Sequence, residues 1–239
     1  MDYAVVTGST KGIGKAIAID LLKKGCYVIF NYSHSDETAE KLKSELSGIS
    51  SNFYIIKADL SSFEGMGVFI KKIKKITCSV KYLFLNVGIT KRINFREIKL
   101  KDWNTIFDAN LTIPFFIIQR LDGLIKDCGR IVFIGSILGQ MPHAVSIPYG
   151  VSKAGINMLA KYLVKEFSAR SITVNVVSPG FVDTAWHNSK NSAQIKRIKN
   201  NIALKRFAQA QEISSTCMHI IDNGYINGQL ICVDGGYNY

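Results

Sequence analysis

A serine, a tyrosine and a lysine stand in an order that could transfer a proton to or from a substrate oxygen. Ser136 follows a short apolar run, and Tyr149 and Lys153 open a long amphipathic stretch. Residues four apart share one face of a helix, so the phenol and the ammonium can lie side by side. A free tyrosine has a pKa of about 10, which a nearby ammonium lowers because it stabilises the phenolate. The trio predicts general acid–base chemistry at an oxygen that Ser136 orients. The alternative is an exposed tyrosine–lysine pair, because this spacing also arises by chance.

A glycine-rich turn near the N-terminus predicts a nucleotide cofactor. It lies between an apolar run and an amphipathic stretch, and it is not a phosphate loop of the GK[ST] type. Glycines allow a tight turn and close approach to a pyrophosphate, and the following helix offers free N–H groups at its N-terminus. The expected cofactor contacts here are Gly8, Ser9, Thr10, Lys11, Gly12, Ile13 and Gly14.

The residues after the second apolar run favour NADP(H) over NAD(H). Enzymes that bind NAD in this way usually place an acid there, which bonds the ribose 2′-hydroxyl. This chain has Asn31, Tyr32 and Ser33 instead, and Asp36 is expected to start the next helix. Lys11 could pair with a 2′-phosphate; the alternative is that it is an exposed loop cation.

These residues need a scaffold, and the chain predicts one of alternating strands and helices. Val- and Ile-rich runs suit strands that are buried on both faces. Strict alternation implies an α/β fold: a single doubly wound, Rossmann-type domain over residues 1–239, with a seven-stranded parallel sheet and helices on both faces. The polar segment 183–206 breaks the rhythm and is expected to be a substrate loop. The expected strands are Tyr3–Thr7, Tyr27–Asn31, Phe53–Lys57, Tyr82–Asn86, Arg130–Ile134, Thr173–Val177 and Leu230–Val233, and the expected helices are Gly14–Lys24, Glu37–Leu46, Gly65–Ile76, Trp103–Leu124, Tyr149–Ala169 and Ala210–Ile221.

Composition narrows the class of protein further. The sequence is 47% hydrophobic and 20% charged, as in ordinary globular proteins. The expected first strand leaves no room for a secretory signal, and no run is long enough to span a membrane, so a cytoplasmic protein is expected.

The five cysteines form no metal motif and are expected to be reduced thiols, and no metal site is expected. The net charge of +12 is spread along the chain. Its densest groups, at 71–75 and 196–206, are expected to be solvated helix faces rather than a nucleic-acid interface.

Taken together, these motifs resemble the short-chain dehydrogenase/reductase family over essentially the whole chain. The resemblance implies a nicotinamide cofactor and a catalytic tetrad of Asn110, Ser136, Tyr149 and Lys153, in which Asn110 holds a proton-relay water and Lys153 also bonds the nicotinamide ribose. It implies adenine contacts at Asp59 and Leu60. It implies nicotinamide contacts at Pro179, Gly180, Val182 and Thr184, and a homo-oligomer, either a tetramer or a dimer. The family's NNAG motif reads Leu85-Asn86-Val87-Gly88 here, so Asn86 and Gly88 are retained while Val87 adds bulk beside the cofactor.

Within that family the chain most resembles 3-oxoacyl-[acyl-carrier-protein] reductases. The similar segments are 28–33, 88–90, 129–136 and 172–181. An acidic carrier protein would suit the positive charge, and Arg170 lies where such reductases present a basic residue, although Asp127 nearby is acidic. Loop 140–145 and the stretch around Trp186 and His187 are expected to line the substrate site. His143 and His187 themselves are expected to be ordinary surface histidines. One alternative is a dehydrogenase that acts on another alcohol or ketone, such as a sugar, a steroid, a quinone, a small ketone or a specialised metabolite. The other is a non-catalytic NADP-binding regulator.

Overall fold

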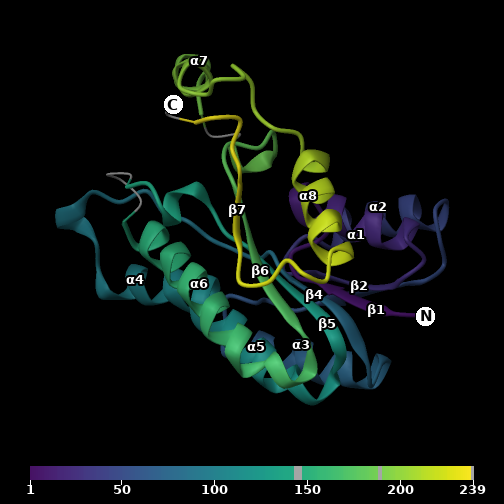
Figure 1. Ribbon diagram of the computed structural model, residues 1–239. Helices are drawn as coiled ribbons and strands as arrows, with labels where there is room; N and C mark the ends of the chain where they lie inside the picture. Colours follow the sequence, from purple (N-terminus) through teal and green to yellow (C-terminus); the bar gives the residue numbers. More distant parts are fainter. Residues whose placement is uncertain (143–146, 188–189, 238–239) are drawn as a thin grey trace.

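The computed structural model describes residues 1–142, 147–187 and 190–237. In these residues a seven-stranded parallel sheet forms the centre of the molecule, with the strand order β3-β2-β1-β4-β5-β6-β7 (Figure 1). The sheet and the single doubly wound arrangement confirm the predicted fold class. The strands are β1 (Tyr3–Val6), β2 (Tyr27–Tyr32), β3 (Phe53–Lys57), β4 (Val80–Leu85), β5 (Ile125–Ile134), β6 (Thr173–Pro179) and β7 (Leu230–Val233).

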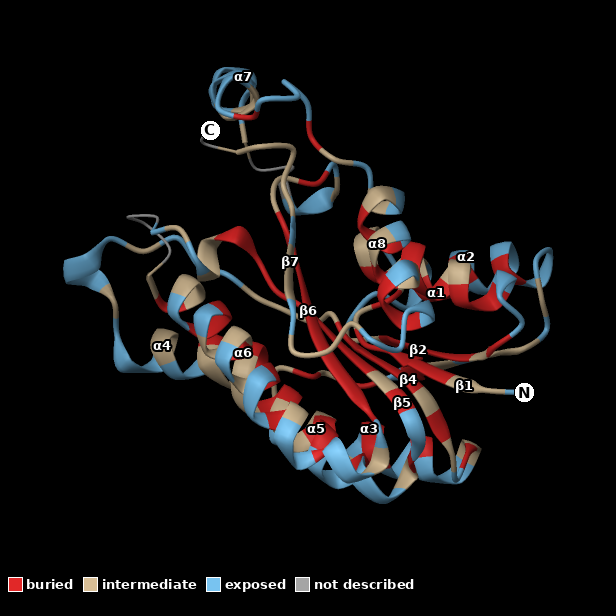
Figure 2. Ribbon diagram, viewed as in Figure 1, coloured by how far each residue is buried: buried red, intermediate tan, exposed pale blue. Residues whose placement is uncertain are grey.

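Helices cover both faces of this sheet (Figures 1 and 2). Side chains alternate along a strand, so Val5 of β1 enters one apolar core while Ala4 and Val6 enter the other. The first core is closed by α3, α5 and α6, and the second by α1, α2 and α8. The helices are α1 (Gly12–Lys23), α2 (Asp36–Ser47), α3 (Phe63–Ile76), α4 (Leu100–Phe107), α5 (Ile113–Leu121), α6 (Ile147–Glu166), α7 (Ser192–Asn200) and α8 (Ala210–Asp222).

The region expected as one helix over Trp103–Leu124 is not a regular α-helix throughout. A π-turn at Asp108–Thr112 separates α4 from α5, and the N–H of Ile113 bonds the carbonyl of Asp108, five residues back. A short 3-10 turn at Asp122–Leu124 follows α5, and β5 then begins at Ile125, earlier than expected. Apolar periodicity runs through the whole stretch, so it does not reveal the extra residue of the π-turn.

Segment 183–206 contains a helix where the sequence predicts a loop. Helix α7 starts at a capping box in which Asn191 and Gln194 exchange hydrogen bonds between side chain and backbone. An asparagine three residues before a glutamine is a helix-start signal that the polar composition of the segment conceals.

The lysines of α3 confirm the expected solvated face, since Lys71, Lys72, Lys74 and Lys75 are exposed opposite a buried apolar face. All five cysteines are free thiols, and Cys26 and Cys217 are buried. Among the described residues, no helix is both long and apolar enough to cross a bilayer.

Candidate active site

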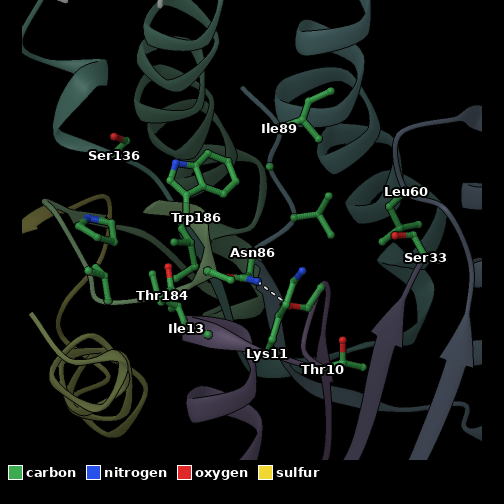
Figure 3. A pocket seen from close by; sticks show the side chains of 18 of the residues that line it. Thr10, Lys11, Ile13, Ser33, Leu60, Asn86, Ile89, Ser136, Thr184 and Trp186 are labelled. Carbon is green, nitrogen blue, oxygen red and sulfur yellow. Dashed lines mark hydrogen bonds between the residues drawn. The ribbon is translucent and has the colours of Figure 1, made fainter. Parts of the chain in front are cut away.

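A pocket of about 710 Å³ lies at the carboxyl ends of the strands, where the order reverses between β1 and β4. This switch point is where open α/β sheets bind ligands. In Figure 3, Ser136 and Trp186 lie on one side of the pocket, and Ser33 and Leu60 lie on the other. The pocket brings together these residues predicted from sequence: Gly8, Thr10, Lys11, Gly12, Ile13, Asn31, Tyr32, Ser33, Asp59, Leu60, Asn86, Gly88, Ser136, Tyr149, Lys153, Pro179, Gly180, Val182 and Thr184.

The glycine turn between β1 and α1 is shaped to receive a pyrophosphate. Gly8 and Gly12 have φ angles of 60° and 57°, a region that favours glycine. A Cβ on Gly14 would overlap the carbonyl of Gly8 and lie 2.6 Å from the amide nitrogen of Asn86. Gly14 therefore does not face the pocket; it allows α1 to pack against the turn.

The start of α1 differs from the starts of α2 and α3. Ser35 and Ser62 cap those two helices with their side chains, whereas the N-cap residue of α1, Lys11, makes no side-chain cap bond. The first turn of α1 also carries no acidic residue. Gly12 and Ile13 of this turn line the pocket, so the uncapped N–H groups and the positive dipole end of α1 fit a dinucleotide phosphate there.

Asn86 holds the glycine turn in place from the end of β4. Its amide nitrogen donates to the carbonyls of Thr7 and Gly8, both at 3.0 Å. In return, the Thr7 hydroxyl accepts the N–H groups of Asn86 and Val87. Figure 3 shows Asn86 between Lys11 and Thr184.

The departures from the NNAG motif have different structural consequences. Leu85 is only 3% exposed and belongs to the core that α3, α5 and α6 close, where an apolar residue is well accommodated. Val87 lines the pocket, and its Cγ2 atom would lie 3.0 Å from a Cβ on Gly8. Gly8 and Val87 are therefore packed as closely as a glycine allows.

Asn31 and Ser9 have structural roles. The side chain of Asn31 is 1% exposed; it accepts the N–H of Gly8 at 3.1 Å and donates to the carbonyl of Ala58 at 3.0 Å. Ser9 is fully buried, donates to the carbonyl of Val6 at 2.7 Å and accepts the N–H of Asn31 at 3.0 Å. Ser9 does not line the pocket. The predicted cofactor contact at Ser9 is therefore wrong at the side-chain level, because a buried hydroxyl with both partners inside cannot reach a ligand.

Asp36 begins α2, as the sequence predicts, and other residues hold it. The Tyr32 hydroxyl donates to one carboxylate oxygen at 2.8 Å, and the Lys57 ammonium contacts the other at 2.5 Å. These contacts hold the pKa of Asp36 below its ordinary value, with Lys57 as the main cause, and raise the pKa of Tyr32 to about 12. Asp36 does not line the pocket, whereas Lys11, Ser33 and His34 do.

Lys153 joins the tyrosine helix to the strand that carries the serine. It is 4% exposed, and its ammonium donates to the carbonyl of Ile134 at 2.8 Å. It lies 5.8 Å from the ring centre of Tyr149. Burial lowers the pKa of Lys153 to about 8. Ser136 lies two residues after the end of β5, and its hydroxyl accepts the N–H of Leu138, which fixes the turn at this point.

The expected lowering of the Tyr149 pKa by Lys153 is not what dominates here. Burial raises the pKa of Tyr149, and the Ser136 hydroxyl acts in the opposite direction. The Lys153 ammonium, which bonds the carbonyl of Ile134, does not offset the effect of burial. In this state Tyr149 is a protonated phenol, which is the form a proton donor requires.

Asn110 lies in the π-turn behind the pocket rather than on its surface. Its carboxamide accepts the N–H of Ile89 at 2.8 Å and donates to the carbonyl of Ile89 and to the Ser152 hydroxyl, both at 3.0 Å. Ser152 donates to the carbonyl of Tyr149 at 2.7 Å. Asn110 thus links the segment after β4 to the first turn of α6, and its side chain positions its neighbours.

The segment after β6 covers the opposite wall of the pocket. A Cβ on Gly12 would lie 3.3 Å from the Thr184 side chain, so Thr184 lies against the glycine turn. Beyond it, the indole of Trp186 is 47% exposed, with its ring centre 6.3 Å from that of Tyr149. Trp186 therefore lies beside the predicted proton donor, as expected for a substrate-lining residue.

Arg170 does not serve the site in the way its sequence position suggests. It lies at the amino ends of β5 and β6, opposite the pocket, and its guanidinium contacts Asp122 at 2.7 Å and Asp127 at 2.9 Å. It also donates to the carbonyl of Ile125. Two carboxylates therefore offset the positive charge that Arg170 would present to a partner.

Several pocket residues were not predicted from the sequence. The part of the pocket near Asp59 and Leu60 also includes His34, Ser35, Thr38, Ala58 and Ser61, and the rest includes Ile89, Ile137, Leu138 and Phe181. The His34 imidazole lies 3.9 Å from the Asp59 carboxylate. No motif marks these residues, because they enter the pocket through strand and helix geometry.

His143 lies outside the described residues, and for His187 only the backbone is described. No cluster of three or more potential metal ligands occurs among the described residues.

Known proteins match this chain over nearly its whole length. A family model described as short chain dehydrogenase matches residues 2–195. A 3-oxoacyl-[acyl-carrier-protein] reductase from Synechocystis is 32% identical over 238 residues, which is 98% of this chain and 95% of that protein. A short-chain dehydrogenase/reductase structure from Serratia marcescens superposes with a TM-score of 0.93 at 28% identity, covering 100% of this chain and 98% of that one. The structure of an angucycline C-6 ketoreductase with bound NADP superposes with a TM-score of 0.91 at 25% identity, covering 98% and 95%.

Proposed function

The chain belongs to the short-chain dehydrogenase family, and we propose that it uses NADPH to reduce the 3-oxo group of an acyl thioester held on a carrier protein. The observation that carries the proposal is the arrangement of one continuous pocket. A phosphate-binding turn opens one part of it, and Ser136, Tyr149 and Lys153 meet at another. A dinucleotide bound along the pocket would bring its reactive ring beside a protonated tyrosine.

In the proposed mechanism this chain supplies the proton and the orientation. A bound nicotinamide supplies the hydride. The Tyr149 phenol donates its proton to the carbonyl oxygen, and the Ser136 hydroxyl donates a hydrogen bond to the same oxygen and polarises it. Lys153 is the buried cation beside Tyr149, and in the proposed mechanism it would stabilise the phenolate once the proton has left and bond the nicotinamide ribose. Asn110 holds Ile89 and the first turn of α6, and at this place we propose the water that returns a proton to Tyr149.

The cofactor preference is proposed from the adenosine side of the pocket. Asp36, the acid nearest to the end of β2, is held by Tyr32 and Lys57 outside the pocket lining. Lys11 is the cation of the glycine turn and lines the pocket, where a 2′-phosphate would be neutralised. The NADP bound to the related angucycline ketoreductase is consistent with this choice.

The substrate class is proposed from the named relatives. The Synechocystis protein and a Staphylococcus epidermidis protein of 32% identity are both named 3-oxoacyl-[acyl-carrier-protein] reductases. A bulky cyclic ketone is the second candidate, because Trp186 places an aromatic surface beside Tyr149, and because one structural relative is named as an angucycline ketoreductase.

The test is NADPH oxidation with a panel of acetoacetyl thioesters, polycyclic ketones, simple ketones, sugars and steroids, with NADH as the cofactor comparison. We expect turnover with acetoacetyl thioesters that Tyr149→Phe abolishes while NADPH still binds. Absence of thioester turnover beside good turnover of a cyclic ketone would select the second candidate. Full turnover by Tyr149→Phe would overturn the proposed role of the tyrosine.

We also propose that the protein is a homo-oligomer. Helix α6 exposes Val151, Met158 and Tyr162, at 46%, 53% and 70%, at spacings that share one helix face. Burying this face against a second copy would remove apolar surface from water. Light scattering during size-exclusion chromatography would measure the assembly, and a monomer at micromolar concentration would contradict it.

A further inference from the structure

A second hollow lies between the segment that follows β4 and the start of α4. It has a volume of about 540 Å³, and four cations line it together with Glu97 and Asp102. We call these cations the basic rim: Lys91, Arg92, Lys99 and Lys101. All four are exposed. Asp102 contacts Lys91 at 2.6 Å, which leaves the rim with an excess of positive charge.

A short stretch of the chain connects the basic rim to the active-site pocket. Ile89 lines the pocket, is held on both its N–H and its carbonyl by Asn110, and leads directly to Lys91. On the other side, Lys190 follows the Trp186 segment and lies close enough to Arg92 for the arginine to help lower its pKa, although burial is the larger cause. Like charges so placed are stabilised when an anion comes between them.

Exposed apolar side chains accompany these cations. Phe95 is 74% exposed and Leu100 is 75% exposed, on the same segment as the rim. Large apolar residues among cations are typical of a protein-binding surface rather than of a plain solvated face. The combination fits a partner whose surface is acidic with some apolar contacts.

We propose that the basic rim is the docking surface for an acidic carrier protein that presents its thioester to Tyr149. This proposal rests on the proposed function and adds where on the surface the carrier protein binds. Arg170 is excluded as the main docking residue, because Asp122 and Asp127 neutralise it at the opposite edge of the sheet. The rim follows the carboxyl end of β4, and the pocket lies at the carboxyl ends of the strands, so a flexible arm that carries the thioester could reach Tyr149 past Ile89.

The test compares one chemical group presented in two ways: acetoacetyl on a carrier protein, and acetoacetyl on the small thiol N-acetylcysteamine. We expect an Arg92→Glu, Lys99→Glu double variant to lose about tenfold or more in kcat/KM for the carrier-protein substrate. Its kcat/KM for the small thioester should stay within twofold of the wild type, which also shows that the variant is folded. Raising the salt concentration should slow the wild type with the carrier-protein substrate only.

Two charge-reversal controls match the variant. Lys74→Glu, Lys75→Glu changes two exposed lysines on α3, and Arg170→Glu changes the neutralised arginine; both should leave carrier-protein kinetics nearly unchanged. Equal losses on both substrates, or a larger loss from Arg170→Glu than from the rim variant, would overturn the proposal.

Direct binding separates this proposal from the proposed function. Unacylated carrier protein should bind the NADPH-loaded wild type and bind the rim variant about tenfold more weakly, whether or not thioester is turned over. If the small thioester is not reduced but this difference in binding appears, the proposed substrate is contradicted while the proposed docking surface is supported. Equal binding of the two proteins, no binding to the wild type, or tighter binding of duplex DNA than of carrier protein would overturn the docking surface.

Discussion

The ammonium of Lys153 donates a hydrogen bond to the carbonyl of Ile134 at 2.8 Å, two residues before Ser136 on the same chain segment. This bond joins α6, which carries Tyr149, to the end of β5, which carries the serine. The lysine therefore holds the geometry of the site as well as supplying its charge. Because it is buried, that charge is also easily lost, and its pKa lies at about 8.

The first prediction concerns the pH dependence of the reduction. Lys153 stabilises the phenolate only while it is charged, so kcat/KM for NADPH should be level below about pH 8 and fall as pH rises through the lysine's pKa. A pH series from 6 to about 9.5 would measure it. Lys153→Arg should lose the fall, because a guanidinium stays charged throughout.

A binding measurement keeps this prediction testable if Lys153→Arg is inactive. Tyr149→Phe retains Lys153, so its NADPH affinity should weaken above the same pH. A profile for kcat/KM that rises through pH 8, or an NADPH affinity that does not change, would contradict the role given to the lysine's charge.

The second prediction concerns the choice between NADPH and NADH. Removing the cation of the glycine turn with Lys11→Ala should raise KM for NADPH at least tenfold, because a charge-assisted hydrogen bond contributes about 1.5–3 kcal/mol. KM for NADH should not change. Lys15→Ala is the control, since Lys15 lies on the same helix but contacts Glu45 at 2.6 Å. Equal effects on the two cofactors would show that Lys11 does not read the 2′-phosphate.

The third prediction compares two glycines on α3. A Cβ on Gly65 would overlap the carbonyl of Asp59, whereas nothing lies within 4 Å of a Cβ on Gly67. Gly65→Ala should lower the free energy of unfolding by about 1–3 kcal/mol and weaken cofactor binding, because it displaces Asp59 and Leu60. Gly67→Ala should raise it by about 0.5–1 kcal/mol, as alanine favours a helix interior. Urea unfolding and NADPH titration measure both, and similar stabilities for the two variants would contradict the close packing at Gly65.

The fourth prediction uses the two tryptophans as reporters. Trp186 lies beside Tyr149, while Trp103 stacks on Phe107 in α4, with ring centres 4.7 Å apart. In a Trp103→Phe background, NADPH should quench the remaining indole fluorescence through its proximity to the cofactor. A Trp186→Phe variant that retains Trp103 should show much weaker quenching. Quenching of the same size in both variants would place Trp186 away from the bound nicotinamide.

The sequence predicted the fold and the family better than it predicted which polar side chains face the pocket. The sheet and the glycine turn are predicted from the apolar runs and the glycines between them, and the structure has both at the predicted places. Asn31 and Ser9 carry polar side chains in the cofactor region, yet both turn inward to satisfy buried backbone groups. Sequence position alone does not say which way a polar side chain at a strand end points.

Electrostatic surfaces were the least predictable feature. The sequence suggests that Arg170 is free to bind an acidic partner. Its ion-pair partners, Asp122 and Asp127, are distant in sequence and meet it only in the folded chain. The basic rim is not predicted from the sequence, because acidic and apolar residues interrupt its cations along the chain. These cations form one surface only in the folded protein. Charge density along a chain is therefore a poor guide to charge density in space.

The π-turn at Asp108–Thr112 makes this stretch intolerant of changes in length. A π-turn is one extra residue in an α-helix, and each residue turns a helix by about 100°. Deleting one residue would repair the regular hydrogen bonding, but it would rotate Ile113, Ile117, Ile118 and Leu121, all buried, away from the sheet. The same deletion would carry Asn110 out of reach of Ile89. Substitutions can accumulate here over evolutionary time, whereas insertions and deletions between α4 and α5 should be rejected.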